Sequence, residues 1–361
     1  MQSKVVSGKS YSFSYKKYLE QFNPSHLDAL SFRGVTQIQL RKIFGQMTAY
    51  WSQENERELI TTVFRHAKEA HKFQKRKSGE DYISHPMQVG IVLYVLTQVF
   101  GRKILFRNIL PATGPAIKKL HRLALIVTLI HDVVEDQGWY FAYKQWLKKF
   151  PQKIEEKVSD HFRLSRETIS LNQVKRILPD SADQSRYFRA MEEQGLTDRF
   201  EFRKRIPEID TDTRLSDLQK KKLKHLLKNF LEIRDKHRQL SLQYIQEEFG
   251  ADVAKSMRII SRPNTLGLTA EKVDIVEEVY FLQYISVDRI NRLFKICDFV
   301  VNSYDFDFLN AYSLGESRQK LAQWFQVRQD KARTHYYPLL ERFPPDFARW
   351  FKKLVELMPV Y

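Results

Sequence analysis

Residues 123–136 read Leu-Ala-Leu-Ile-Val-Thr-Leu-Ile-His-Asp-Val-Val-Glu-Asp, and this stretch decides the fold. Residues 123–130 form the best apolar run of the chain, and a run of this kind predicts a buried helix. Four ionisable groups follow it directly: His131, Asp132, Glu135 and Asp136. Because burying charge without a partner is costly, the sequence predicts a group that compensates these side chains.

The spacing of the four groups predicts their arrangement. On a helix, His131 and Glu135 lie one turn apart, and so do Asp132 and Asp136. The two pairs therefore share adjoining faces of the helix. A cation at the mouth of the site would satisfy them.

A second polar cluster lies upstream. Residues 72–86 read Lys-Phe-Gln-Lys-Arg-Lys-Ser-Gly-Glu-Asp-Tyr-Ile-Ser-His-Pro, which combines a basic cluster, a glycine turn and a histidine before a proline. A single histidine at a helix start, such as His85, is more often a capping or core residue than a metal ligand. Taken alone, this cluster therefore does not predict a functional site; it does so only in combination with the other polar clusters.

A third cluster occupies residues 294–302, which read Phe-Lys-Ile-Cys-Asp-Phe-Val-Val-Asn. Asp298 interrupts an otherwise apolar helix, and Asn302 lies one turn further on the same face. Taken alone, this segment predicts a buried Asp298 whose charge is satisfied by Lys295 or by a backbone donor.

The rest of the chain favours helices. Apolar residues recur at spacings of three and four along almost its whole length, and the alternation typical of strands is scarce. Breakers such as Pro151, Pro207 and Gly250 mark the expected helix ends. We therefore predict an all-α protein.

Composition and charge narrow the class of protein. The 361 residues are 43% hydrophobic with 12 Gly and 12 Pro, which excludes a disordered or collagen-like chain. The only cysteine, Cys297, cannot form a disulfide framework, which is typical of a reducing compartment and favours the cytoplasm. No signal peptide and no membrane span are expected, since residues 123–130 are too few to cross a bilayer.

The net charge of +17 predicts a polyanionic partner, and it is unevenly distributed. It amounts to about +5 in residues 1–50, +4 in residues 51–136, +8 in residues 137–243 and zero in residues 244–361. Within 137–243, a lysine cluster follows a helical pattern: Lys220, Lys221, Lys222, Lys224 and Lys228. These lysines indicate either a solvated helix face or a surface that binds nucleic acid.

Together, the three polar clusters resemble the HD-domain metal-dependent phosphohydrolases, and among them the hydrolase domain of the RelA/SpoT family and its small stand-alone relatives. The resemblance rests on Arg-Lys-Ser-Gly-x-x-Tyr-Ile-x-His-Pro at 76–86, His-Asp-Val-Val-Glu-Asp at 131–136 and Lys-Ile-x-Asp-x-x-x-Asn at 295–302. It implies an HD-domain helical bundle. The chain then divides into a basic N-terminal extension (1–50), a first core part (51–136), a basic helical insertion (137–243) and a second core part with C-terminal helices (244–361).

The resemblance also implies roles for the site residues. The metal ligands would be His85, His131, Asp132 and Asp298, and they would bind one Mn²⁺ ion. Glu135 and Asp136 would be catalytic, because they orient or deprotonate the attacking water and protonate the leaving group. Contacts to the nucleotide would come from Arg76, Lys77, Ser78, Lys295 and Asn302.

The implied activity is removal of the 3′-pyrophosphate from guanosine tetra- or pentaphosphate, (p)ppGpp, to give GDP or GTP. The sequence departs from the family at Phe299 and Val301, where relatives have polar residues, and by the insertion 137–243. These departures leave two alternatives. One is an HD phosphohydrolase for another nucleotide, such as an adenine alarmone, NADPH or a nucleic-acid end; the other is a non-catalytic module that binds nucleotide, nucleic acid or a protein partner through its basic segments.

Overall fold

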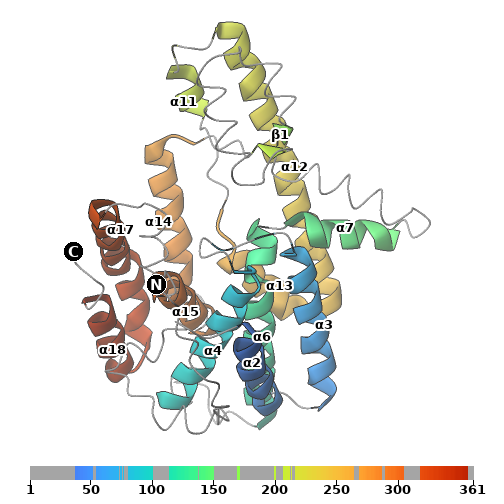
Figure 1. The fold of residues 1–361 in the computed structure, drawn as a ribbon, viewed down its shortest axis with the longest axis vertical. Helices are drawn as coiled ribbons and strands as arrows, with labels where there is room; N and C mark the ends of the chain where they lie inside the picture. Colours follow the sequence, from blue (N-terminus) through green and yellow to red (C-terminus); the bar gives the residue numbers. More distant parts are fainter. Residues whose placement is uncertain are drawn as a thin grey trace, which may run out of the picture.

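The computed structural model describes residues 37–51, 54–72, 74, 76, 80–100, 114–136, 138–149, 169–170, 199–200, 206–211, 213, 216–263, 268–286, 289–304 and 318–356. Almost all the regular structure in these ranges is helical, which confirms the predicted all-α fold (Figure 1). The exception is one antiparallel pair of two-residue strands, β1 (Ile169–Ser170) and β2 (Arg199–Phe200).

Helix α6 (Gly114–Asp136) contacts most of the other core helices. Its apolar run behaves as predicted, because every residue from 124 to 130 is buried, including Thr128. The hydroxyl of Thr128 donates a hydrogen bond to the Ala124 carbonyl within the helix, so this polar group is satisfied inside the core. Around α6 pack α2 (Gln37–Trp51), α3 (Glu54–Ala70), α4 (Ser84–Val99), α13 (Ala251–Ile260) and α15 (Arg289–Tyr304).

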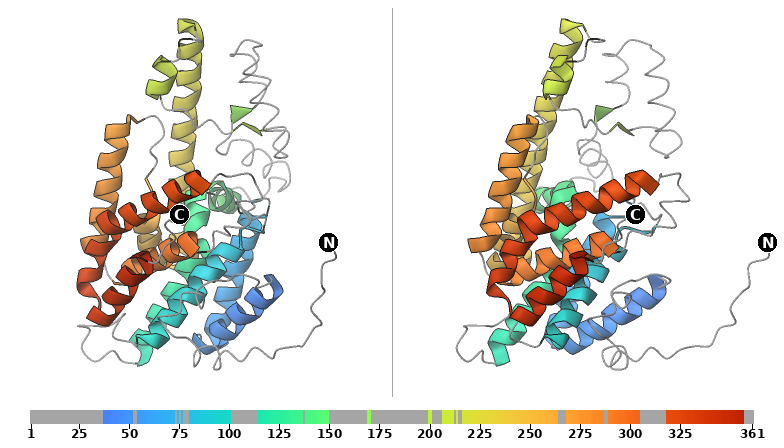
Figure 2. Two further views of the ribbon diagram at one scale, coloured as in Figure 1. Left: turned by 60° about the vertical axis from the view of Figure 1, so that its left-hand side comes forward. Right: turned by 90° about the vertical axis from the view of Figure 1, so that its left-hand side faces the viewer.

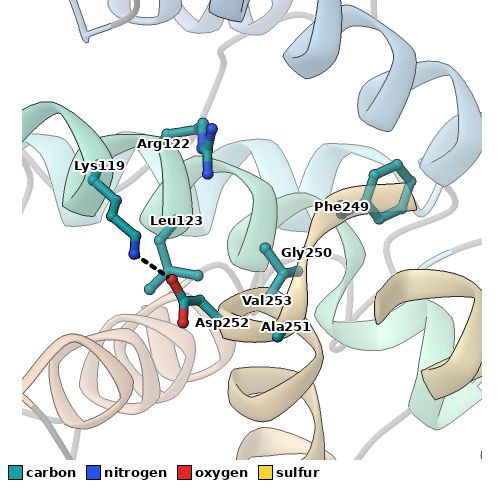
Figure 3. Close-up of a pocket in the computed structure, with 8 residues that line it drawn as sticks. All are labelled: Lys119, Arg122, Leu123, Phe249, Gly250, Ala251, Asp252 and Val253. Atoms are coloured by element: carbon teal, nitrogen blue, oxygen red, sulfur yellow. Dashed lines mark ion pairs between the residues drawn. The ribbon is translucent and has the colours of Figure 1, made fainter. Parts of the chain in front are cut away.

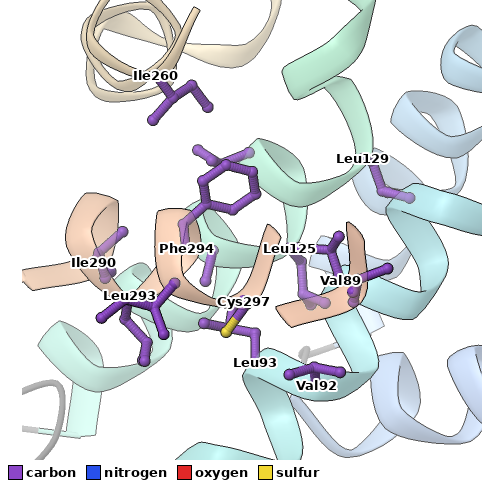
Figure 4. Packing of buried hydrophobic residues seen from close by; sticks show 14 of the residues in the cluster. Val89, Val92, Leu93, Leu125, Leu129, Ile260, Ile290, Leu293, Phe294 and Cys297 are labelled. Carbon is purple, nitrogen blue, oxygen red and sulfur yellow. The ribbon is translucent and has the colours of Figure 1, made fainter. Parts of the chain in front are cut away.

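Helices α4, α6 and α15 contact one another in pairs, and this triangle positions the candidate site. Figure 4 shows their shared core, in which Val89 and Leu93 of α4 lie beside Leu125 of α6 and Cys297 of α15. Helix α4 approaches its neighbours closely at Gly90. A Cβ atom there would lie 3.0 Å from Phe44 on α2 and 3.1 Å from Thr128 on α6, so glycine allows the close packing.

Helix α2 belongs to this core although it falls mostly within the predicted N-terminal extension. It buries Leu40, Ile43, Phe44 and Met47. The part of residues 1–50 that the structure describes therefore packs as core. The basic residues before position 37 lie outside the described residues.

The described elements of the predicted insertion are α7 (Gly138–Lys149), the two strands, α11 (Ile206–Thr211) and most of α12 (Asp217–Phe249). Helix α12 begins at a capping box, in which the Ser216 hydroxyl and the Gln219 side chain bond each other's backbone N–H groups. Its C-terminal part packs on α7 and α13, with the Phe141 and Tyr244 rings stacked at 5.3 Å. Its N-terminal part projects with α11 beyond the bundle (Figures 1 and 2).

Gly250 ends α12 and begins α13 with φ of 103°. This backbone conformation is readily adopted only by glycine, so the sequence fixes a sharp turn there. Because α12 continues to Phe249, position 243 lies inside a helix that joins the insertion directly to the second core part.

The C-terminal region wraps the core with further helices. Phe347, Phe351 and Leu354 of the last helix are buried, so this helix is anchored in the core. The elements in order are α14 (Ala270–Ser286), α17 (Arg318–Lys331), a π-helical turn (Ala332–Tyr336), a 3-10 helix (Tyr337–Arg342) and α18 (Pro345–Glu356).

Candidate metal centre

The structure brings all four predicted metal ligands together from the three helices of the triangle. His85 lies in the first turn of α4, His131 and Asp132 lie near the C-terminal end of α6, and Asp298 lies in the middle of α15. The Nε2 atom of His85 is 3.3 Å from Oδ1 of Asp298 and 3.5 Å from Oδ2 of Asp132. Nε2 of His131 is 3.0 Å from the same Asp132 oxygen. The ligand atoms of His85, His131 and Asp298 all lie within 4.8 Å of one another.

The ring of His131 is oriented for this role by its own helix. Its Nδ1 atom lies 2.8 Å from the carbonyl oxygen of Thr128. A carbonyl can only accept, so Nδ1 carries a proton and Nε2 faces the carboxylates. Backbone orientation of this kind is typical of metal-binding histidines.

The protonation states show what the site requires. Burial alone would lower the pKa of His131, but the charge and hydrogen bond of Asp132, together with the charge of Asp298, outweigh burial and raise this pKa to about 9. Burial would likewise raise the pKa of Asp132, yet His131 holds it well below its usual value. Burial lowers the pKa of His85. At neutral pH, His131 is therefore a charged imidazolium. It lies among two carboxylates and the neutral imidazole of His85.

This donor set fits a divalent cation. The Nε2 atoms of His85 and His131 lie within 3.5 Å of carboxylate oxygens of Asp132 and Asp298, and this mixture of imidazole and carboxylate donors suits a divalent cation. A cluster of His85, His131 and Asp298, all of them buried, could therefore hold a metal ion.

Other side chains fix the two carboxylates. The Tyr82 hydroxyl donates to Oδ2 of Asp132 at 3.0 Å. The amide of Asn302 donates to Oδ1 of Asp298 at 2.6 Å, and the Lys295 ammonium group donates to Oδ2 of Asp298 at 3.3 Å. Lys295 thus satisfies Asp298, as the third cluster predicted when taken alone. The contact of Lys295 and Asn302 with a nucleotide stays a prediction.

Tyr82 is a site residue to which the sequence assigned no role, although it lies three residues before His85. Its ring stacks on His71, with ring centres 4.7 Å apart, and Nδ1 of His71 lies 2.7 Å from Oε1 of Gln74. Burial lowers the pKa of His71 to about 4, so this imidazole is neutral. His71 and Gln74 together support the tyrosine that holds Asp132.

The structure describes the positions of some of the remaining predicted site residues. Glu135 follows His131 by one helical turn, and its Oε2 atom accepts the backbone N–H of Arg262 at 3.1 Å. Arg76 lies close enough to His85 to contribute to the lowering of its pKa. The side chain of Asp136 and all of Lys77 and Ser78 lie outside the described residues.

A second charged group beside the centre was not predicted. Arg262 and Lys331 both form ion pairs with Glu277, the latter at 3.4 Å. Partial burial, together with the charges of Arg262, Lys295 and Arg328, lowers the pKa of Lys331 to about 8. We call Arg262, Arg328 and Lys331 the cationic wall. The sequence gives no signal for it, because its members come from two segments far apart in the chain.

The two departures from the family motif lie in the core. Phe299 and Val301 are buried, and the Phe299 ring packs on Tyr336 and Phe351, with ring centres 4.3 Å and 5.9 Å away. A cavity of about 110 Å³ between α6 and the α12–α13 turn is lined by Lys119, Asp252 and six other residues (Figure 3). Lys119 precedes His131 by about three helical turns, so this cavity is not part of the metal centre.

Comparison with protein-family models, with curated proteins and with solved structures finds no match for this chain. Among the helices that the structure describes, none combines the length and the hydropathy of a transmembrane segment. The fold and site thus define an all-α protein with a buried His/Asp cluster that could hold a metal ion.

Proposed function

We propose that this chain is a metal-dependent phosphohydrolase of the HD-domain type that removes the 3′-pyrophosphate from (p)ppGpp to give GDP or GTP. One observation carries the proposal: His85, His131, Asp132 and Asp298 converge from three helices, with Glu135 one turn beyond. Two imidazoles and two carboxylates suit a borderline or hard divalent ion, and the family resemblance implies that this ion is Mn²⁺. The single cysteine favours action in the cytoplasm.

The proposed reaction breaks the bond between the 3′-oxygen of ribose and phosphorus. Water supplies a hydroxyl group to phosphorus, and a proton goes to the 3′-oxygen. A divalent ion held by His85, His131, Asp132 and Asp298 would supply positive charge for the phosphoryl oxygens and would acidify the attacking water. Glu135 accepts the proton of that water, and Asp136 protonates the leaving oxygen.

The cationic wall supports a substrate with several phosphates. Arg262 is tied to Glu135 through its backbone, and Lys331 shares the carboxylate of Glu277 with Arg262. Lys331 is only partly exposed, which strengthens its interaction with an anion. A guanidinium group binds phosphate oxygens in a bidentate manner, which favours Arg262 and Arg328 as phosphate ligands.

The test is release of pyrophosphate from ppGpp by the purified protein with Mn²⁺. The wild type should hydrolyse ppGpp. The Asp132→Asn variant should lose nearly all of this activity, because the substitution removes a carboxylate that is proposed to bind the metal. Asp274→Asn is the matched control, since Asp274 is exposed on α14, and it should keep wild-type activity. Pyrophosphate release that persists in Asp132→Asn, or none from the wild type, would contradict the proposal.

A panel of nucleotides assayed under the same conditions separates the alternatives. If an adenine alarmone, NADPH or a nucleic-acid end is hydrolysed faster than ppGpp, that compound is the substrate. The metal-dependent phosphohydrolase reaction would then be retained. Nucleotide binding without turnover of any compound would identify a non-catalytic module.

A further inference from the structure

Arg238 links the predicted insertion to the candidate active site. It lies on α12, and its side chain reaches the C-terminal end of α13. Nη2 donates to the carbonyl oxygen of Ser261 at 3.0 Å, and Nη1 lies 3.4 Å from the carbonyl oxygen of Arg262. Carbonyls at a helix C-terminus lack partners within the helix, and a cation there also interacts favourably with the helix dipole.

A second side chain fixes the same helix end. The Tyr280 hydroxyl, from α14, donates to the carbonyl oxygen of Ile260 at 2.5 Å. Three successive carbonyls, at Ile260, Ser261 and Arg262, are therefore held by side chains from two other helices. The backbone between them has little freedom to rotate.

The peptide group between Ser261 and Arg262 is the key contact. Its carbonyl oxygen accepts from Arg238, and its N–H group donates to Oε2 of Glu135 at 3.1 Å. Because a peptide group is planar, fixing its oxygen also fixes the direction of its N–H bond. A cation on the oxygen further polarises the group, which strengthens the hydrogen bond to Glu135.

We propose that Arg238 is a positioning residue, which holds the Glu135 carboxylate in its working orientation through the Ser261–Arg262 peptide group. The inference rests on the proposed function, in which Glu135 accepts the proton of the attacking water. It gives the insertion a role at the site, since an arginine from outside the family-like core orients the base. The competing explanation is that Arg238 only stabilises the end of α13.

The test compares Arg238→Gln and Arg238→Lys with Lys236→Gln, a control that removes an exposed cation from the same helix. We expect Arg238→Gln to lower kcat about tenfold with KM changed less than about twofold, since a misplaced base slows chemistry without weakening binding. Arg238→Lys should recover part of the loss, because the ammonium group can still donate to Ser261. Lys236→Gln should match the wild type.

A double-mutant cycle with Glu135→Gln distinguishes the two explanations. If Arg238 acts through Glu135, adding Arg238→Gln to Glu135→Gln should change the residual kcat by less than about twofold. A further tenfold loss in that background would show that Arg238 acts independently of Glu135, and would overturn the proposal. Equal KM and kcat effects in the single variant would count against it as well.

A measurement that does not depend on catalytic activity tests this inference separately from the proposed function. The Arg262 amide should exchange its hydrogen about tenfold faster in Arg238→Gln than in the wild type, as measured by mass spectrometry of peptides that span residues 257–263. If the wild type hydrolyses no nucleotide, the proposed function fails, and this exchange rate still tests whether Arg238 holds the Ser261–Arg262 peptide group against Glu135. An unchanged exchange rate overturns the inference.

Discussion

At the scale of single residues, His131 holds a proton where a metal ion is expected to bind. The pKa of His131 is raised to about 9, chiefly because Asp132 outweighs the effect of burial. A raised pKa means that the proton stabilises the folded state below about pH 6.5, and that this contribution is lost as the pH rises through about 9. Metal and proton therefore compete for the same imidazole.

Metal affinity should consequently depend on pH. We expect the apparent affinity for Mn²⁺ to rise about tenfold per pH unit up to about pH 9, because His131 must lose its proton to bind metal. Over the same range the melting temperature of the metal-free protein should fall, and Mn²⁺ should restore it. Calorimetric titrations between pH 6.5 and 9 in two buffers measure affinity and proton release together. Absence of proton release would show that His131 is not a ligand, and His131→Gln should abolish the pH dependence.

Tyr82 gives a prediction about the support of a ligand. Tyr82→Phe removes the hydroxyl that donates to Asp132 but keeps the ring stacked on His71. Loss of such a supporting hydrogen bond should weaken Mn²⁺ binding about tenfold. Tyr337→Phe, in the 3-10 helix, is the control and should leave affinity unchanged. An equal effect of both changes on thermal stability, with no change in metal affinity, would refute a role for Tyr82 at the site.

At the scale of elements, the site exists because α4, α6 and α15 pack closely. Gly90 allows α4 to approach α2 and α6, whereas Gly45 on α2 is exposed, and nothing lies within 4 Å of a Cβ atom built there. Gly90→Ala would bring its methyl group to 3.0 Å from the buried Phe44 ring. Because Phe44 is buried, we expect the contact to shift α4, and His85 with it.

The two glycines form a matched pair for testing this packing. Gly90→Ala should destabilise the protein by about 1–2 kcal/mol, because the clash outweighs the better helix propensity of alanine. Gly45→Ala should stabilise it by about 0.5–1 kcal/mol through propensity alone. Denaturant titrations measure both. A stabilising Gly90→Ala would show that the helices can separate without cost, and Mn²⁺ affinity would then also be unaffected.

How far the sequence predicts these elements depends on the kind of contact. Residues 124–130 of the apolar run are buried as predicted, since its period and composition carry the signal. The resemblance to the HD-domain family also implied that His85, His131, Asp132 and Asp298 belong together. By contrast, Glu135 accepts a backbone N–H from a residue 127 positions away, and any residue type except proline could supply that donor. Contacts of this kind, and the cationic wall, depend on tertiary packing that no local pattern encodes.

At the scale of the whole molecule, the described residues include two separate groups of cationic side chains. The cationic wall lies beside the metal centre. A separate group of lysines lies on the part of α12 that projects from the bundle (Figure 2). Lys220 and Lys224 bind Asp210 of α11, at 2.9 Å to its carbonyl and 2.7 Å to its carboxylate, whereas Lys221, Lys222 and Lys228 are exposed. Only the exposed three are available to a polyanion without breaking a contact on α11.

This division predicts that nucleic-acid binding and hydrolysis can be separated. Replacing Lys221, Lys222 and Lys228 with glutamine should reduce the slope of log affinity against log salt for single-stranded RNA by about 2, since three neutralised phosphates release their counterions. Hydrolysis of ppGpp should change less than about twofold, because screening by salt limits the reach of charges on a projecting helix. Filter binding at several salt concentrations, with activity measured in parallel, checks both. A variant that binds RNA as the wild type does would show that these lysines serve only as a solvated helix face, and the polyanion that the net charge predicts would then be the nucleotide at the metal centre.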